Sequence, residues 1–326
     1  MTAALFLLSA LVQEDLPHRV FRGEAMGSAL EIQVLGPDPA VLDRAIAEAR
    51  AEIDKLDRMM TDWKETGALM EVNRNAGLNP VTVPPEFLFI VKRSLQVSEL
   101  TNGAFDITWA GAGRLWKWWE KDPQVPSPGE VKAALENVGW RNVLLDEKAS
   151  TLFLAKPGVR IGLGAIVPGY AGDLAMRKIR TLGVKDALVN LSGDILAAGT
   201  NRGQPWKIGL EHPRRPGETF AVMPISDQAV STSSDSKRFF VRDGKRYGHI
   251  IDPRTGYPAE RCQSATVTAS TLAYADALAT AVFVLGPEEG MALLEKLPGV
   301  EGVIVAADGK VSVSSGLSRE RLGVKP

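Results

Sequence analysis

The sequence predicts an α+β fold built mostly from antiparallel strands, with helices interspersed between them. Apolar residues alternate with polar ones at Leu30, Ile32 and Val34, as expected for a half-buried strand. Short turn signals such as Asp243-Gly244 join neighbouring strand-like segments directly, which favours antiparallel pairing. Stretches with helical spacing recur between these segments, and this combination is typical of the α+β class.

The composition narrows the class of protein. The chain has 326 residues, of which 24% are charged and 45% hydrophobic, so it can bury a sizeable core. The formal net charge is -1 and no basic stripe stands out, so we expect no nucleic-acid partner. Cys262 is the single cysteine, which excludes an intrachain disulfide and a cysteine-rich metal site.

Residues 1–15 form a short apolar run that ends in a polar stretch. An apolar run of about ten residues suits a signal peptide, whereas a membrane span takes about 20. The run lacks a basic start, a clear cleavage motif and the cysteine of a lipoprotein. We expect an exported protein, with a possible leader at 1–15 and one domain at 16–326; the alternative is a frayed N-terminus.

The first strands and the first helix follow from local signals. The turn at residues 26–28 predicts a strand pair around it. Asp38 can cap the next helix and Pro39 suits its first turn. The apolar residues of this helix fall on one stripe at helical spacing: Leu42, Ala45, Ala49, Ile53, Leu56 and Met60.

A second helix is expected between the prolines at 84–85 and the Asn-Gly pair at 102–103. The tryptophan-rich stretch that follows holds Trp116, Trp118 and Trp119. These indoles could form a stacking platform, but we expect a helix end and a proline-rich loop whose indoles cover the core.

The remaining elements alternate in the same way. Residues 150–166 predict a strand pair, and residues 168–183 predict a helix with proline in its first turn. Strands then dominate, apart from helices at 272–286 and 287–299. Residues 300–316 predict a closing hairpin.

A glycine-rich stretch precedes the helix at 168–183. Gly162, Gly164 and Gly169 have the spacing G-x-G-x4-G, which misses the G-x-G-x-x-G of dinucleotide-binding folds. Such a turn lets backbone N–H groups approach an anion at a helix N-terminus. Tight strand–helix packing explains it equally well.

Two acidic positions are candidates for chemistry. Asp106 in NGAFDIT follows a helix directly and is either a site residue or an ordinary turn residue. Asp276 and Thr280 share one face of a helix that is otherwise small and apolar. Such oxygen ligands suit Mg²⁺. Alternatively, Thr280 bonds back to the Asp276 carbonyl, with Asp276 as an early-turn carboxylate.

His249 is one of three histidines and stands between Gly248 and Ile250. A lone histidine beside apolar neighbours is either a packed ring or a catalytic base, and geometry must decide between them.

Together and in this order, these stretches resemble the ApbE family of FAD:protein FMN transferases. The resemblance runs from about residue 26 to residue 285. The matching segments are AMGSALEIQV, NGAFDIT, GLGAIVPGYAGDLA, ALVNLSGDILAAG with PWKIGLEHP, VSTSSDSKRFF, GHIIDPRTGYP and ADALATAVFVLG.

The resemblance implies an exported, Mg²⁺-dependent enzyme with an ApbE-like α+β fold and a cleft for the flavin. Such an enzyme splits FAD, attaches FMN to a Thr or Ser hydroxyl of a target flavoprotein and releases AMP. The usual targets are subunits of membrane redox pumps. The alternatives are an FAD pyrophosphatase, which makes FMN and AMP, and a non-catalytic flavin-binding or interaction protein.

The resemblance also implies roles for individual residues. His249 matches the proposed base, with Asp252 as either its orienting group or a turn cap. The metal positions match Asp276, Thr280 and a group at Ala165, taken as its backbone oxygen. The expected FAD contacts are Met26, Trp63, Ala104, Phe105, Asp106, Pro168 and Ile250.

Several positions depart from the family pattern. Gly162 stands where an aspartate is usual, and Pro168 stands where a Lys or Glu is usual. Ser234 and Ser236 replace a glycine and a tyrosine, and residues 67–68 replace a Ser-Glu pair. The metal and base positions are kept, so the pattern predicts altered handling of FAD.

Overall fold

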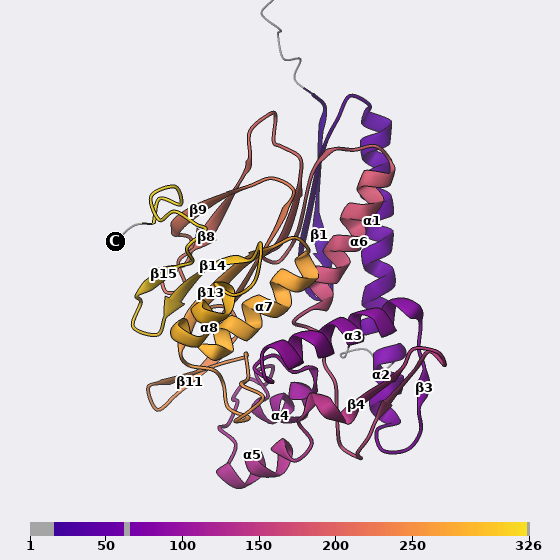
Figure 1. Ribbon diagram of the computed structural model, residues 1–326, viewed down its shortest axis with the longest axis vertical. Coiled ribbons are helices and arrows are strands. Elements are labelled where there is room, and N and C mark those ends of the chain that lie inside the picture. The colour runs from indigo at the N-terminus through magenta and orange to yellow at the C-terminus, as the bar shows by residue number, and fades with distance from the viewer. Residues whose placement is uncertain (1–15, 62–65, 325–326) are drawn as a thin grey trace, which may run out of the picture.

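A large antiparallel sheet forms the centre of the molecule, in a computed structural model that describes residues 16–61 and 66–324 (Figure 1). Its strand order is β1-β2-β6-β7-β10-β13-β14-β15, and every neighbouring pair is antiparallel. The predicted α+β class with mostly antiparallel strands is confirmed. The strands of this sheet are β1 (His18–Ala25), β2 (Ser28–Leu35), β6 (Asp186–Leu191), β7 (Asp194–Ala198), β10 (Gln228–Ser234), β13 (Cys262–Ala269), β14 (Glu301–Ala306) and β15 (Val311–Val313).

Three smaller sheets and a set of helices complete the described structure. The small sheets are β3 (Val81–Thr82), β5 (Thr151–Leu154) and β4 (Val143–Asp146); β8 (Trp206–Glu211) and β9 (Thr219–Ile225); and β11 (Phe239–Arg242) and β12 (Lys245–Gly248). The α-helices are α1 (Pro39–Met60), α2 (Ala68–Arg74), α3 (Pro85–Leu100), α4 (Ala110–Gly113), α5 (Pro128–Leu135), α6 (Val167–Thr181), α7 (Leu272–Leu285) and α8 (Pro287–Leu294). The 3₁₀ turns are η1 (Ile107–Trp109), η2 (Arg114–Trp116) and η3 (Trp140–Asn142).

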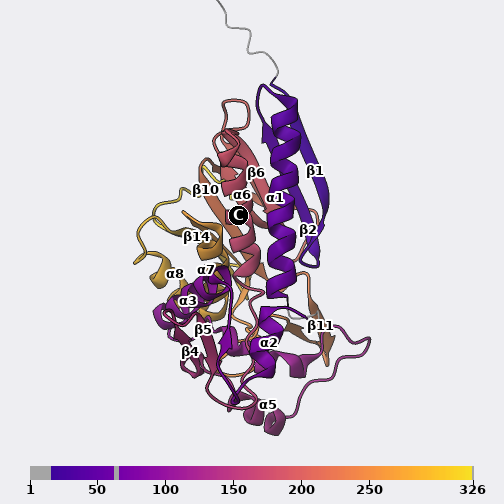
Figure 2. The same ribbon diagram turned by 90° about the vertical axis from the view of Figure 1, so that its right-hand side faces the viewer.

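The two faces of the large sheet are covered differently. Helices α1, α6 and α7 pack on one face, where α1 and α6 run side by side (Figure 2). The β8–β9 hairpin packs on the other face, against a second apolar cluster. Because side chains alternate along a strand, Ala187 and Val189 of β6 face the helices while Leu188 faces β8–β9.

The first elements form as the sequence predicts. Met26 and Gly27 both have positive φ, 53° and 68°, and join β1 directly to β2. The Asp38 carboxylate caps α1 by accepting from the Ala40 N–H at 2.9 Å. All six residues of the expected apolar stripe are buried.

Of the strand pair expected at residues 150–166, only the first strand forms. β5 forms, but residues 158–163 stay outside any strand. The side-chain amide of Asn73 takes the place of a neighbouring strand, accepting from the Ile161 N–H at 2.8 Å and donating to the Ile161 carbonyl at 2.9 Å. A single side chain therefore satisfies backbone groups that a ladder would otherwise pair.

The tryptophans of the stretch 116–119 differ in their exposure to solvent. Trp116 is fully buried and donates to the Gly256 carbonyl at 3.0 Å, as expected for an indole that covers the core. Trp119 is 70% exposed, so the expectation is wrong for this residue. A short turn, η2, ends at Trp116 and carries the chain outward before Trp119.

Helices α6 and α7 approach each other unusually closely at their N-terminal ends. A Cβ at Gly169 would lie 2.5 Å from the Leu272 carbonyl oxygen, so only glycine fits. The Asp173 carboxylate of α6 accepts from the Leu272 and Ala273 N–H groups at 2.8 and 3.0 Å, and thereby caps α7. Gly169 of the glycine-rich stretch thus serves helix–helix packing, which differs from the strand–helix packing considered as one alternative.

The described residues contain no helix that combines the length and apolar character needed to cross a bilayer. The possible leader at 1–15 and Trp63 lie outside the described residues. The division into leader and domain stays a prediction.

Gly169→Ala tests the close helix approach. We expect it to lower the free energy of unfolding by about 1–3 kcal/mol, because the new methyl group meets backbone atoms that cannot give way. Gly129→Ala is the matched control. Gly129 also lies in the first turn of a helix, α5, but a Cβ there has open space. It should be neutral or stabilise by up to about 1 kcal/mol. Equal values for the two variants in urea denaturation would contradict the packing argument.

Candidate functional site

A cavity of about 1020 Å³ opens where β7, β10, the start of α6 and the segment after β12 come together. Its size is at the upper end for small-molecule pockets, as a dinucleotide requires. The lining includes every expected site residue in the described part of the chain: Met26, Ala104, Phe105, Asp106, Ala165, Pro168, His249, Ile250, Asp276 and Thr280. The structure brings these residues together, and their individual roles stay predictions.

A buried carboxylate, Asp276, and a half-buried one, Asp194, line the cavity. Asp276 is 5% exposed, and burial, reinforced by the negative charge of Asp194, raises its pKa well above the usual value. Burial also raises the pKa of Asp194 to about 6, against the opposing effects of the Ser231 hydroxyl and of Lys237. Carboxylates that are partly removed from water and whose negative charges repel each other favour a cation beside them.

Asp194 was not among the expected site residues. It follows the turn at Ser192 and Gly193, whose φ values of 56° and 109° are both positive. This tight turn between β6 and β7 places the carboxylate at the cavity wall. A carboxylate directly after a two-residue turn at the end of a buried strand is the signal that could have identified it.

The oxygen atoms near Asp276 fit a hard cation. Asp276 accepts from the Gly169 N–H at 3.1 Å, and Thr280 shares a hydrogen bond with the Ser233 hydroxyl at 3.0 Å. Thr280 therefore does not bond back to the Asp276 carbonyl. Among the backbone hydrogen bonds of the described residues, none ends on the Ala165 carbonyl, which lines the cavity.

This donor set differs from a cluster of acidic or imidazole ligands. In the parts of the chain that the structure describes, no three His, Cys, Asp or Glu side chains form a metal-binding group. One carboxylate, one hydroxyl and one carbonyl suit Mg²⁺, which keeps several water or phosphate ligands.

His249 follows directly after β12 and is half-buried at the cavity wall. Its N–H donates to the Arg238 carbonyl at 3.0 Å, and its ring Nδ1 lies 3.2 Å from the same oxygen. That contact leaves Nε2 for a ligand. Burial and the Arg238 charge lower the pKa of His249 to about 4, against a weaker opposing effect of Asp235.

Asp252 does not orient this ring. Its two carboxylate oxygens pair with the Arg254 guanidinium at 2.9 and 2.8 Å. Its backbone carbonyl accepts from the Gly256 N–H at 2.8 Å and closes the following turn. Of the two roles considered, the structure shows the turn cap.

Asp106 is also engaged within the protein. One oxygen accepts from the N–H and hydroxyl of Thr108 at 2.8 and 2.7 Å, and the other accepts from the Trp140 N–H at 2.8 Å. Burial raises its pKa in spite of these bonds. Asp106 thus anchors a buried turn at the cavity wall, which is the ordinary turn role left open by the sequence.

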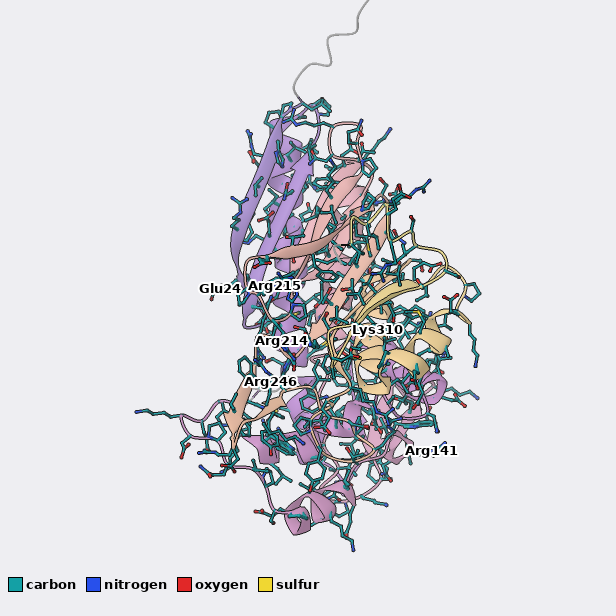
Figure 3. The ribbon with its side chains drawn as sticks, turned by 90° about the vertical axis from the view of Figure 1, so that its left-hand side faces the viewer. Glu24, Arg141, Arg214, Arg215, Arg246 and Lys310 are labelled. Atoms are coloured by element: carbon teal, nitrogen blue, oxygen red, sulfur yellow. The ribbon has the colours of Figure 1, made fainter. Side chains whose placement is uncertain are left out.

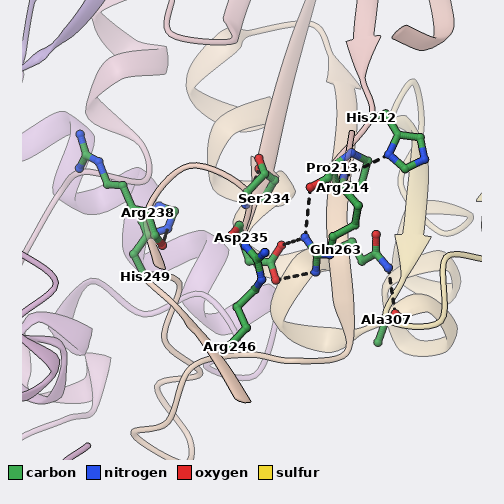
Figure 4. A network of polar contacts seen from close by, with 11 residues as sticks. His212, Pro213, Arg214, Ser234, Asp235, Arg238, Arg246, His249, Gln263 and Ala307 are labelled. Atoms are coloured by element: carbon green, nitrogen blue, oxygen red, sulfur yellow. Dashed lines mark hydrogen bonds and ion pairs between the residues drawn. The ribbon is translucent and has the colours of Figure 1, made fainter. Parts of the chain in front are cut away.

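An ion pair behind the cavity holds the segment that carries His249 (Figure 4). The Arg214 guanidinium donates two hydrogen bonds to the Asp235 carboxylate, at 2.5 and 2.8 Å. The Asp235 carbonyl accepts from Arg246 at 3.1 Å, and a Cβ on Gly248 would lie 3.0 Å from the Asp235 side chain. Asp235 therefore joins the β8–β9 loop, the end of β10 and β12. The sequence carried no local signal for this pairing.

The departures from the family pattern have local explanations. A Cβ at Gly162 would lie 3.1 Å from the Ala110 methyl group, so the position is crowded. Pro168 lies in the first turn of α6, where it costs no hydrogen bond. The Ser234 and Ser236 hydroxyls hydrogen-bond to each other at 2.7 Å.

Comparison with known proteins agrees with this geometry. A sequence model of the ApbE family matches residues 26–304. The chain is 33% identical to an FAD:protein FMN transferase of Treponema pallidum, over 90% of this chain and 85% of the relative. It is 32% identical to an FAD:protein FMN transferase of Klebsiella pneumoniae, over 85% of this chain and 81% of the relative.

Solved structures of ApbE proteins have the same fold as this chain. The ApbE protein of Thermotoga maritima superposes with a TM-score of 0.86 at 31% identity, over 92% of this chain and 98% of that one. The apo flavinyl transferase ApbE of Pseudomonas stutzeri superposes with a TM-score of 0.83 at 29% identity, over 95% of this chain and 98% of that one.

The lowered pKa of His249 is directly measurable. We expect its ring to stay neutral in the free protein until the pH falls towards about 4, because burial disfavours the imidazolium. NMR titration of the three histidines, with His249→Gln to assign the signal, provides the measurement. A pKa of 6 or higher for His249 would contradict the buried setting described here.

Proposed function

The chain belongs to the ApbE family, and we propose that it transfers FMN from FAD to a Thr or Ser hydroxyl of a target flavoprotein and releases AMP. Identities of 30–33% to FAD:protein FMN transferases over most of the chain make it an enzyme of this activity. The observation that carries the finer proposal is the cavity itself, which gathers an imidazole and a buried acidic oxygen set around one space.

We propose that Mg²⁺ binds at Asp276, Thr280 and the Ala165 carbonyl. Two observations support this assignment. The pKa of Asp276 is raised, and the Ala165 carbonyl accepts no backbone hydrogen bond, so neither oxygen has a positively charged partner. When bound, the ion would neutralise charge on the FAD pyrophosphate as a Lewis acid. Asp194, beside Asp276, would add to the negative field that retains it.

His249 acts in this proposal as the general base. Its low pKa keeps the ring neutral at physiological pH, so Nε2 has a free lone pair while Nδ1 contacts the Arg238 carbonyl. The same low pKa makes His249 a weaker base than free imidazole in the unliganded protein. His249 would take the proton of the acceptor hydroxyl at Nε2 as the hydroxyl oxygen bonds to the phosphorus of the FMN half. The bond between that phosphorus and the bridging oxygen breaks, and AMP leaves with the bridging oxygen.

In this proposal, the Arg214–Asp235 ion pair positions His249 for proton transfer. By fixing the backbone on both sides of the hairpin end, it limits the positions that the His249 ring can adopt. Accurate placement of a base is worth as much as its basicity, because a misplacement of about 1 Å can cost on the order of a hundredfold in rate.

We further propose that the protein is exported and that its target is a subunit of a membrane redox enzyme. The apolar run at residues 1–15 supports export. The type of target rests on the family resemblance.

One assay tests the function. The protein is incubated with FAD, Mg²⁺ and a candidate acceptor flavoprotein, and AMP release and acceptor mass are measured. A mass gain equal to FMN, with equimolar AMP, is the expected result. AMP and free FMN without a mass gain would indicate an FAD pyrophosphatase instead. Retention of intact FAD would indicate a flavin-binding protein without transferase activity.

His249→Ala tests the base. We expect transfer to fall by roughly 10²–10⁴-fold with FAD affinity unchanged, because proton removal is lost while the cavity remains. FAD binding is followed by quenching of flavin fluorescence, independently of turnover. Transfer at the wild-type rate would remove His249 from the mechanism.

Asp276→Asn tests the cation site through stability as well as activity. The folded-state pKa of Asp276 is raised, so its ionisation lowers the stability of the metal-free protein as the pH rises. The metal-free variant should therefore melt no lower than the wild type at pH 7.5. Added Mg²⁺ should raise the Tm of the wild type and not that of the variant. An equal Mg²⁺-induced shift in both proteins would place the metal elsewhere.

A further inference from the structure

The β11–β12 hairpin projects from the body of the molecule beside the cavity (Figures 1 and 3). It forms a two-stranded sheet of its own, and its last residue, Gly248, directly precedes His249. The hairpin has a packed face and a free face, and on the free face only Arg246, which donates to the Asp235 carbonyl, has a part in the proposed chemistry so far.

The packed face is held by aromatic contacts. Phe240 and Tyr247 stack with their ring centres 5.1 Å apart, and Tyr247 stacks on Trp116 at 5.5 Å. Trp118 also donates to the Tyr247 carbonyl at 3.3 Å. The hairpin is thus fixed to the buried tryptophan at the core, and it can present its other side as a firm surface.

The free face carries exposed apolar groups. Phe239 is 39% exposed and Val241 is 55% exposed. Arg246 pairs with Val241 across the strands, and its guanidinium lies 3.5 Å from the centre of the Phe239 ring. We call Phe239, Val241 and Arg246 the hairpin face.

The hairpin is strongly basic on a protein that is nearly neutral overall. Residues 237–249 hold five basic side chains and one acidic side chain, whereas the whole chain has a formal net charge of -1. Asp122 neutralises Arg242, and Glu260 neutralises Lys245. Within the described residues, Lys237, Arg238 and Arg246 form no ion pair with a carboxylate. This excess of positive charge complements an acidic partner.

The hairpin face also continues into the cavity. Arg238 and Phe239 line the cavity, while Val241 lies farther along the strand, outside the lining. An acceptor hydroxyl that reaches His249 from solvent brings its flanking residues past this face, because His249 follows the hairpin without a gap.

We propose that the hairpin face binds the acceptor protein, through an extended segment with apolar residues next to the reacting hydroxyl and acidic residues outside them. This proposal rests on the proposed function. Phe239 and Val241 cover the apolar residues of the segment, and Arg246 faces its carboxylates. The cavity selects FAD, and the hairpin selects the protein that receives FMN.

Direct binding of a labelled peptide tests the surface without turnover. The probe is Glu-Glu-Val-Leu-Ala-Leu-Val-Glu-Glu, in which alanine stands in place of the reacting Thr, and binding to the FAD-loaded protein is read by fluorescence anisotropy. Two control peptides replace every Glu by Lys or every Val and Leu by Ser. We expect each control to bind on the order of tenfold more weakly, because each removes one of the two recognised features.

Val241→Glu places a negative charge on the hairpin face, and Val20→Glu is its matched control. Val20 is a 40% exposed valine on the edge strand β1 and does not line the cavity. We expect Val241→Glu to weaken binding of the acidic peptide by about fivefold to tenfold and Val20→Glu to leave it unchanged. FAD affinity, measured by fluorescence quenching, should be the same in both variants.

The outcomes separate this proposal from the proposed function. Equal binding of the three peptides, no binding of any of them, or equal affinity of the two variants overturns the docking surface. Binding to phosphatidylglycerol vesicles without discrimination among the peptides also overturns it and indicates a membrane contact. Selective peptide binding together with a negative FMN-transfer assay would keep the surface and reject the transferase.

Discussion

The contact between the N-terminal ends of α6 and α7 is the constraint on which the site depends. Gly169 has no side chain, so the backbone of α7 can approach that of α6 directly. Asp173 caps α7, and the Gly169 N–H donates to Asp276. The same contact that packs the two helices thus holds an Asp276 oxygen at the start of α6, directly after the turn that contains Ala165. Helix packing and the proposed cation site would both follow from one close approach.

The carboxylates that line the cavity destabilise the folded protein when no cation is bound. Asp276 is buried and Asp194 is half-buried, and loss of solvent raises both pKa values. A stability-optimised core would place apolar groups there, since buried acids without cations cost folding free energy. Their retention is explained if the site is completed by a divalent ion and a pyrophosphate. Burial shifts the pKa of His249 in the opposite direction. It lowers this pKa and so keeps the ring neutral in the free protein.

Local signals predicted the longer helices α1, α3, α6, α7 and α8 and most strands, because caps, prolines and apolar periodicity act over a few residues. Asp38, Pro39 and the stripe of α1 are examples. The short helices α2 and α5 were not predicted. The backbone at 158–163 was mispredicted because its partner is the distant side chain of Asn73. For the site, the family resemblance identified the residues that line the cavity. Asp194, the Arg214–Asp235 pair and the shifted pKa of His249 all depend on contacts between distant segments, which residue spacing does not encode.

The central claim is that the α6–α7 contact builds a cation site in front of His249. A crystal structure of the protein with FAD and Mg²⁺ tests it most directly. The account predicts an ion within about 2.0–2.1 Å of an Asp276 oxygen, the Thr280 hydroxyl and the Ala165 carbonyl, with the FAD pyrophosphate completing its coordination. An ion bound without Asp276, or a pyrophosphate bound away from α6 and α7, would contradict it.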